Sequence, residues 1–170
     1  DMVLEDYLSG VYVIAATLIL YGIAFIVIES RNRRPSMRSL EDLTYKAAFF
    51  IGCFQVLAAI PGTSRSGATI LGAVLLGCSR YVASEFSFFL AVPVMAGASG
   101  LKLIKYFLKV GMFSGSEWIL LTVGTVVSFL VSILAIRLLL SYIRKHDFKV
   151  FGVYRILLGI VVIVYFGFLV

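Results

Sequence analysis

Residues 58–73, with the sequence AAIPGTSRSGATILGA, place a proline, glycines, hydroxyl side chains and one arginine inside an apolar stretch. Arg65 is central, because the nearest charged residues along the chain are Lys46 and Arg80. An arginine at membrane depth costs about 2.5–3.5 kcal/mol even on the lenient insertion scale. A cost of this size indicates a functional site. Because the paired N–H groups of a guanidinium match phosphate oxygens, we expect an anion as the partner.

The neighbours of Arg65 add donors for the same anion. Ser64 or Ser66 is placed to cap a helix beginning near Gly67, and such a helix directs free N–H groups and the positive end of its dipole at the anion. Gly62 and Gly67 allow the backbone to approach a ligand closely. The hydroxyl groups belong to Thr63, Ser64, Ser66 and Thr69. The loop therefore predicts a phosphate site, with one alternative: a Pro-Gly kink in which Arg65 pairs with a structural carboxylate.

These residues must be positioned by helices in a membrane. The chain of 170 residues is 61% hydrophobic and 14% charged, well below the charged fraction of soluble domains. Its net charge of +6 fits basic loops that face the cytoplasm and anionic lipid, and we expect no nucleic-acid partner. We predict one all-α integral membrane domain over residues 1–170. Its four transmembrane helices are expected at 11–28, 82–105, 118–140 and 150–170.

Two shorter apolar segments flank the polar loop. Each is too short to cross a bilayer alone, and the loop rich in Pro and Gly argues against one continuous helix. We predict a re-entrant helix–loop–helix hairpin, with arms at 43–60 and 67–78, that enters and leaves the membrane on one side.

The basic loops support this hairpin. Residues 29–46, 79–81 and 141–149 fall on one side only if the hairpin does not cross the membrane, and positive loops face the cytoplasm. The positive residues of these loops are Arg31, Arg33, Arg34, Arg38, Lys46, Arg80, Arg144, Lys145 and Lys149.

The motif PGTSRSGAT, followed by SRYVASEFSFFLAVP, lies within residues 55–100. It resembles the second conserved region of the bacterial undecaprenyl-diphosphate phosphatases of the bacitracin-resistance type, and weaker similarity continues to the C-terminus. The resemblance implies an enzyme that removes the terminal phosphate of undecaprenyl diphosphate and so recycles the lipid carrier of cell-wall synthesis. It also implies the bacterial cytoplasmic (inner) membrane, a pocket open to the periplasmic or extracellular side, and a divalent cation (Mg or Ca).

The resemblance also assigns roles to individual residues. Arg65 would hold the diphosphate and offset its charge, Ser64 would bond phosphate oxygens, and Thr69 would support them from the first turn of the helix. These three are the expected catalytic residues. The expected phosphate-binding residues are Gly62, Thr63, Ser66 and Gly67.

The family's other essential region has no match in this sequence. That region holds a Glu-x-x-x-Glu element and a Pro-Val-Ser-Ser-x-Gly-His loop. We therefore expect the C-terminal part of a longer enzyme, one half of an inverted-repeat fold, inactive alone and with its metal ligands outside this chain. The expected partners are undecaprenyl diphosphate, membrane lipid and the missing N-terminal part, and a homodimer is left open.

Two other functions compete with hydrolysis by this family. A polyprenyl-phosphate or other anion transporter, or a flippase, would use the same re-entrant loop. Lipid phosphatases of the acid-phosphatase type need a nucleophilic histidine, but His146 lies in a basic loop on the side opposite the expected pocket, so that class is excluded.

Overall fold

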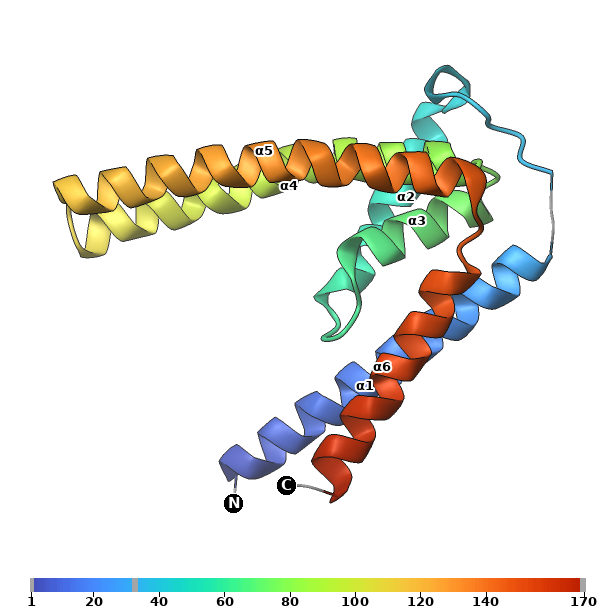
Figure 1. Cartoon of the computed structure of the whole chain (residues 1–170), viewed down its shortest axis with the longest axis horizontal. Helices are drawn as coiled ribbons and strands as arrows, with labels where there is room; N and C mark the ends of the chain where they lie inside the picture. The colour runs from blue at the N-terminus through green and yellow to red at the C-terminus, as the bar shows by residue number, and fades with distance from the viewer. Residues whose placement is uncertain (1, 32–33, 169–170) are drawn as a thin grey trace. The chain divides into compact units, whose positions relative to one another are not determined.

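The computed structural model describes residues 2–31 and 34–168, and these residues form helices and connecting loops with no β-strand (Figure 1). The helices are α1 (Met2–Ser30), η1 (Leu40–Asp42), α2 (Tyr45–Gln55), η2 (Val56–Ala59), α3 (Arg65–Leu75), α4 (Arg80–Lys109), α5 (Gly115–Lys145) and α6 (Lys149–Phe168). Four of them, α1, α4, α5 and α6, contain segments long and apolar enough to cross a membrane. The predicted all-helical, multi-pass membrane class is confirmed at this level.

The helices extend beyond the predicted apolar ranges. For example, α4 begins at Arg80 and ends at Lys109, whereas the apolar range was 82–105. Polar residues at the ends of a span remain helical, although hydropathy alone does not include them. Within the predicted hairpin, helix α3 begins at Arg65 rather than near Gly67. Arg33 of the predicted basic loop lies outside the described residues.

The chain divides into two compact units, Asp1–Ser87 with His146–Val170, and Phe88–Lys145. In the first unit, α1 and α6 pack side by side along their length (Figure 1). Glycines bring the two backbones together: a Cβ on Gly152 would lie 2.7 Å from the Gly22 carbonyl oxygen, and one on Gly159 would lie 3.0 Å from that of Ala15. Small residues at such positions allow the close van der Waals packing on which helix association in lipid depends.

Helices α2 and α3 form a hairpin whose two ends meet. The N–H groups of Ser36 and Met37 both donate to the Gly77 carbonyl oxygen, and Ser79 N–H donates to that of Met37 at 2.8 Å. Between the arms, the ring of Phe54 occupies the space beside Gly72, where a Cβ would collide with it. The chain therefore enters and leaves the segment from Arg38 to Leu76 at the same place.

A buried carboxylate holds the first unit together near these ends. Glu29, at the end of α1, is only 6% exposed at its side chain and forms an ion pair with Arg80 at the start of α4. The same carboxylate accepts the backbone N–H of Phe148 at 3.3 Å, immediately before α6. One residue thus fixes where three of the long helices begin or end.

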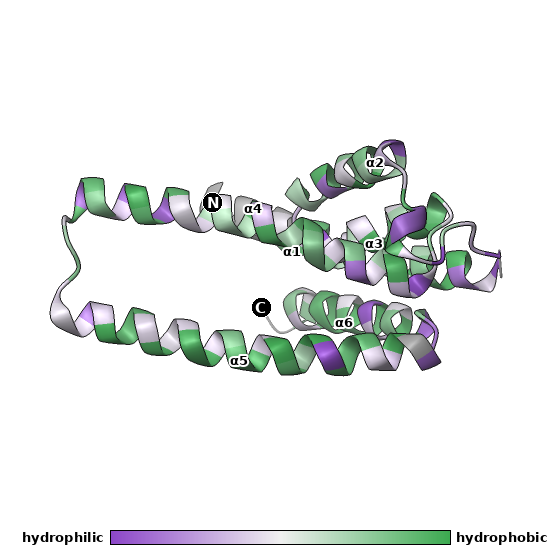
Figure 2. Ribbon diagram, turned by 90° about the horizontal axis from the view of Figure 1, so that it is seen from above, coloured by the Kyte–Doolittle hydropathy of each residue, from purple (hydrophilic) through white to green (hydrophobic). Residues whose placement is uncertain are grey.

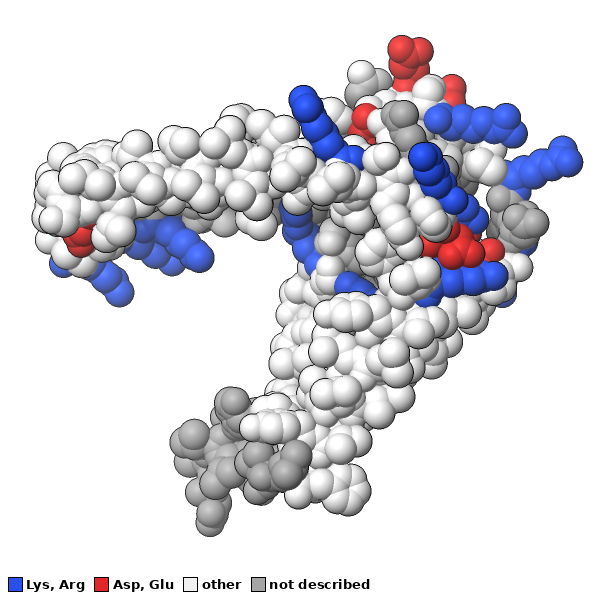
Figure 3. Space-filling view, in the orientation of Figure 1, with Lys and Arg blue, Asp and Glu red and all other residues white. Residues whose placement is uncertain are grey.

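Charged side chains gather at the loop before α2 in Figure 3, where Arg34, Arg38, Glu41 and Asp42 are exposed, whereas most of α6 presents uncharged atoms on this face. Within this loop, the Asp42 carboxylate accepts the N–H groups of Ser39 and Arg38, each at 2.9 Å. These backbone donors, with Ser39 first, lower the pKa of Asp42 below its usual value. The carboxylate is therefore charged at neutral pH and stabilises the turn into η1.

The second unit consists of the rest of α4, a short turn and α5. Aromatic rings fill the turn: Phe113 stacks on Tyr106 with centroids 4.6 Å apart and meets Trp118 edge-on at 5.2 Å. Hydrophobic residues cover most of the visible length of α5 in this unit and of α6 in the other, as Figure 2 shows. Helices that are apolar on nearly all sides are typical of membrane spans.

The glycine contacts of α6 yield a stability prediction. We expect Gly152→Ala to lower the midpoint of thermal unfolding in detergent, because the added methyl group meets the Gly22 backbone, and overpacking typically costs about 1–3 kcal/mol. Gly124→Ala in α5 is the matched control. Its Cβ would meet nothing within 4 Å, and alanine is favoured over glycine in a helix by about 0.5–1 kcal/mol. Equal midpoints for the two variants would contradict the assigned contact.

Candidate functional site

The tip of the hairpin rests against the middle of α1. The Thr17 hydroxyl donates to the carbonyl oxygen of Pro61 at 2.9 Å. Gly62 has a positive φ of 82°, and a Cβ there would come within 2.6 Å of the Ile14 Cα. Glycine is thus required at 62 both by backbone conformation and by the approach to α1. The structure gives this glycine a docking role, in addition to the predicted place in the phosphate site.

Ser64 is the residue that caps α3. Its backbone is extended, with φ −70° and ψ 129°, and its hydroxyl oxygen accepts the Gly67 N–H at 3.2 Å. The Ser66 hydroxyl lies 3.1 Å from that of Ser64. An α-helix leaves the first N–H groups without partners inside the helix, so those of Arg65 and Ser66 remain at its open end, where the dipole favours an anion.

Arg65 occupies the first position of α3 and is half-buried. Its Nη1 atom is inaccessible to solvent and has no hydrogen-bond partner. Among the described residues the ion pairs join Arg80 to Glu29 and Lys149 to Asp147, and none involves Arg65. The alternative of a structural carboxylate for Arg65 therefore finds no support in the part of the chain described.

Thr63 and Thr69 occupy different environments. Thr63 is 8% exposed, and its hydroxyl oxygen is buried without a hydrogen-bond partner among the described residues. Thr69 is 1% exposed, and its hydroxyl lies 2.6 Å from Ser87 Oγ and 3.1 Å from the carbonyl oxygens of Arg65 and Ser66. Thr69 is thus placed to hold the first turn of α3 against α4.

A residue that the sequence reasoning overlooked also lies at this helix end. Arg155 projects from α6 toward Gly67, where an added Cβ would lie 2.9 Å from its Nη2 atom. Arg155 is half-buried, and its Nη1 atom is inaccessible to solvent and lacks a partner. The signal was available, because an ionisable residue within a predicted span is a site candidate by default.

Metal ligands are not gathered near this loop. Among the side chains that the structure describes, those of residues 10–31, 34–143 and 145–168, no group of three or more His, Cys, Asp or Glu is placed to hold a metal ion. The donors around α3 are hydroxyl, amide and guanidinium groups, which suit an anion rather than a cation. The described residues therefore do not fit the divalent cation that the resemblance implies.

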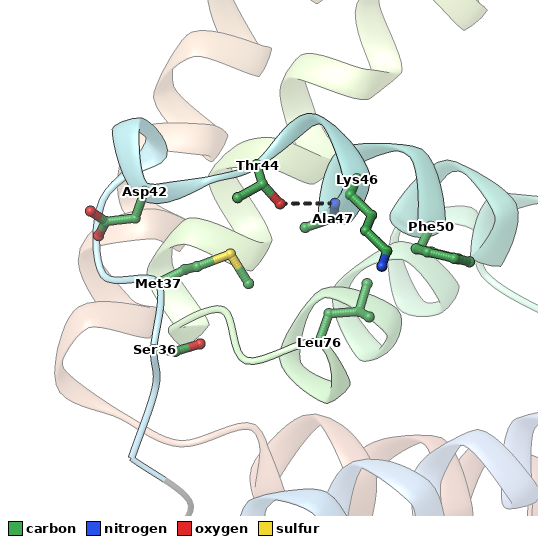
Figure 4. Close-up of a pocket in the computed structure, with 8 residues that line it drawn as sticks. All are labelled: Ser36, Met37, Asp42, Thr44, Lys46, Ala47, Phe50 and Leu76. Atoms are coloured by element: carbon green, nitrogen blue, oxygen red, sulfur yellow. Dashed lines mark hydrogen bonds between the residues drawn. The ribbon is translucent and has the colours of Figure 1, made fainter.

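A cavity of about 380 Å³ lies at the other end of the hairpin, near the start of α2 and the end of α3 (Figure 4). Its lining residues are Ser36, Met37, Asp42, Thr44, Lys46, Ala47, Phe50 and Leu76. The Thr44 hydroxyl is occupied there, because it caps α2 by accepting the Ala47 N–H at 3.2 Å. No predicted site residue lines this cavity, so it is separate from the candidate site.

Known proteins resemble this chain over nearly its whole length. The family described as bacitracin resistance protein BacA matches residues 1–161. The chain is 58% identical over 165 residues to an undecaprenyl-diphosphatase of Lactiplantibacillus plantarum, covering 96% of the chain and 60% of the relative. Over 155 residues it is 62% identical to undecaprenyl-diphosphatase 1 of Clostridioides difficile, covering 91% and 55%. Over 170 residues it is 55% identical to an undecaprenyl-diphosphatase of Enterococcus faecalis, covering 96% and 62%. The chain thus spans between 55% and 62% of the length of these relatives.

The contact between Thr69 and Ser87 can be tested by removing one hydroxyl. We expect Thr69→Val to lower the thermal unfolding midpoint, because Ser87, itself 3% exposed, would keep a buried hydroxyl without its partner at a cost of about 1–3 kcal/mol. Thr125→Val is the matched control, since the exposed Thr125 hydroxyl donates to the Leu121 carbonyl oxygen within its own helix rather than to another helix. If the two variants unfold at the same temperature, the contact does not hold α3 to α4.

Proposed function

Because the chain belongs to the family of the bacitracin resistance protein BacA, we propose that it is part of a membrane enzyme that hydrolyses undecaprenyl diphosphate. The reaction breaks the phosphoanhydride bond, adds water and yields undecaprenyl phosphate and inorganic phosphate. The printed names of the relatives support this substrate and reaction. The product would re-enter cell-wall synthesis as a lipid carrier.

The observation that carries the proposal is the buried, unpartnered guanidinium nitrogen of Arg65 at the capped end of α3. A diphosphate supplies the oxygens that this nitrogen and the free N–H groups of the helix end lack. As the terminal phosphoryl group leaves, negative charge grows on the bridging oxygen, and fixed positive groups stabilise it without having to reorganise. Ser64 and Ser66 would hold the helix end in shape, and Thr63 would offer a further hydroxyl.

The hairpin is proposed to be re-entrant. Its two ends lie together, and its tip meets Thr17 of the span Gly10–Ser30. Thr17 is 13 residues before Ser30, or about 20 Å along a helix, so a hairpin entering beside Ser30 reaches beyond the middle of the bilayer. This depth supports a site open to the periplasmic or extracellular side of the bacterial cytoplasmic membrane. We also propose that the hairpin is one of two facing loops in an inverted-repeat fold.

The divalent cation remains a proposal drawn from the resemblance. Since the described residues offer no ligand cluster for it, we derive no step through it. The residues of this chain bind, orient and offset charge, and the enzyme needs further groups to activate water.

A transporter or flippase for polyprenyl phosphates would also bind an anion at a broken helix end. The names of the relatives favour hydrolysis. Release of inorganic phosphate distinguishes the two functions, because transport leaves the phosphoanhydride bond intact.

The hydrolysis proposal predicts a large effect at Arg65. In the purified full-length protein, we expect Arg65→Ala to reduce phosphate release from undecaprenyl diphosphate by about 100-fold or more, the usual effect of removing one donor to a developing oxyanion. Arg65→Lys keeps the charge but loses the paired donors, so we expect a loss of about tenfold or more. Arg38→Ala, which removes an exposed arginine of the loop before α2, is the control and should retain activity. Wild-type rates from Arg65→Ala would refute the assignment.

A further inference from the structure

Arg155 is a charge inside a membrane-spanning helix, and no ion pair among the described residues neutralises it. It is the sole Lys or Arg between Val150 and Phe168 in α6. Resting on the proposed function, we propose that Arg155 is a second guanidinium that binds the diphosphate at the open end of α3, together with Arg65. The site would then recognise a diphosphate from two helices of the fold rather than from the loop alone.

The position of the Arg155 side chain supports this role. A Cβ at Gly67 would lie 2.9 Å from its Nη2 atom and 3.2 Å from its Cζ and Nη1 atoms. Gly67 is the third residue of α3, and its own N–H group is the one that Ser64 caps. The guanidinium therefore lies against the first turn of α3, beside the N–H groups that an anion would meet.

The surroundings of Arg155 hold the guanidinium without neutralising it. Its Cζ atom lies 5.9 Å from the ring centroid of Tyr21 and 5.7 Å from that of Phe25, both on α1. Aromatic faces attract a cation, but they do not accept the in-plane N–H bonds of a guanidinium. No carboxylate of the described residues pairs with Arg155, and its Nη1 atom is buried without a partner.

Position along the helix also separates Arg155 from ordinary snorkelling residues. A lysine or arginine near the end of a span extends its charged head to the water at the interface. Arg155 instead has its head beside α3 and an inaccessible Nη1 atom. A buried cation in this situation needs an anion, and the diphosphate of the proposed substrate is an anion of the right chemistry.

Two guanidinium groups would bind the substrate more tightly than the product. A diphosphate offers more charge and more oxygens than the monophosphate that remains on the lipid. Loss of the terminal phosphate removes groups that Arg65 and Arg155 would share, so the product is held less tightly and can leave.

The experiment uses the purified full-length protein in lipid-free detergent, with inorganic pyrophosphate as the probe. Ligand that binds the folded state raises the thermal unfolding midpoint, so we expect pyrophosphate to raise that of the wild type. For Arg155→Gln we expect the shift to disappear and the KM for undecaprenyl diphosphate to rise about tenfold or more, equivalent to about 1.4 kcal/mol. Arg137→Gln, which removes an exposed arginine from α5, is the matched control and should behave as the wild type.

Arg155→Lys keeps the experiment decisive if Arg155→Gln does not fold. Lysine retains the charge and the contact with the aromatic rings but loses the fork of donors, so we expect a folded protein whose KM rises several-fold. An unchanged KM and pyrophosphate shift in a folded Arg155 variant would overturn the inference. A fall in stability alone, with ligand binding intact, would also overturn the inference and leave Arg155 a structural role through its packing on Tyr21 and Phe25.

Two further outcomes locate the source of any failure. If the wild type releases no phosphate, the proposed function fails, whereas a hydrolysing wild type and an equally active Arg155→Gln protein refute only the role of Arg155. A lipid headgroup would present the same phosphate chemistry. A wild-type shift with phosphatidylglycerol but none with pyrophosphate would therefore overturn the assignment to the substrate.

Discussion

An arginine enclosed by apolar helices needs an acceptor for its N–H groups, and this requirement governs the arrangement around α3. Arg65 and Arg155 each have a buried Nη1 atom without a partner. Charges of this kind persist in a membrane protein when a bound ion, water or an opposite charge completes them. The described helices provide the enclosure but not the opposite charge, and under the proposed function the diphosphate of the substrate would supply it.

The scaffold around this site depends on close backbone contacts. Helices α1 and α6 pair through glycines such as Gly22 and Gly152, and this pairing brings Arg155 to the side of α1 that the hairpin contacts. Gly62 then lets the hairpin tip rest on α1. At the opposite end, Glu29 joins the ends of three long helices through Arg80 and the backbone of Phe148. Glycines therefore determine how closely the helices approach one another, and the carboxylate of Glu29 determines where α4 and α6 begin relative to the end of α1.

Much of this arrangement was accessible from the sequence because local rules determine it. The four long apolar helices followed from hydropathy, and the break at Pro61 and Gly62 predicted the turn. The preference of helix starts for a hydroxyl left Ser64 and Ser66 as candidate caps, and the structure identifies Ser64 as the cap. Arg155 and the bond between Thr69 and Ser87 depend on contacts between helices distant in sequence, and periodicity carries no information on which faces meet. Gly62 was assigned to ligand approach, and only the structure showed its contact with α1.

Gly67 is of a residue type that destabilises a helix, and it lies where α3 meets Arg155 of α6. Glycine inside a helix costs about 1 kcal/mol relative to alanine, and Gly67 has no positive φ to justify it. A Cβ at Gly67 would instead lie 2.9 Å from the Nη2 atom of Arg155. A residue type that disfavours the secondary structure in which it lies, at a position where the backbone conformation does not require it, often belongs to a functional site. Here the missing methyl group leaves room for a cation at the end of a helix whose dipole favours anions, so in the proposed site the glycine, the arginine and the helix end would bind the same ligand.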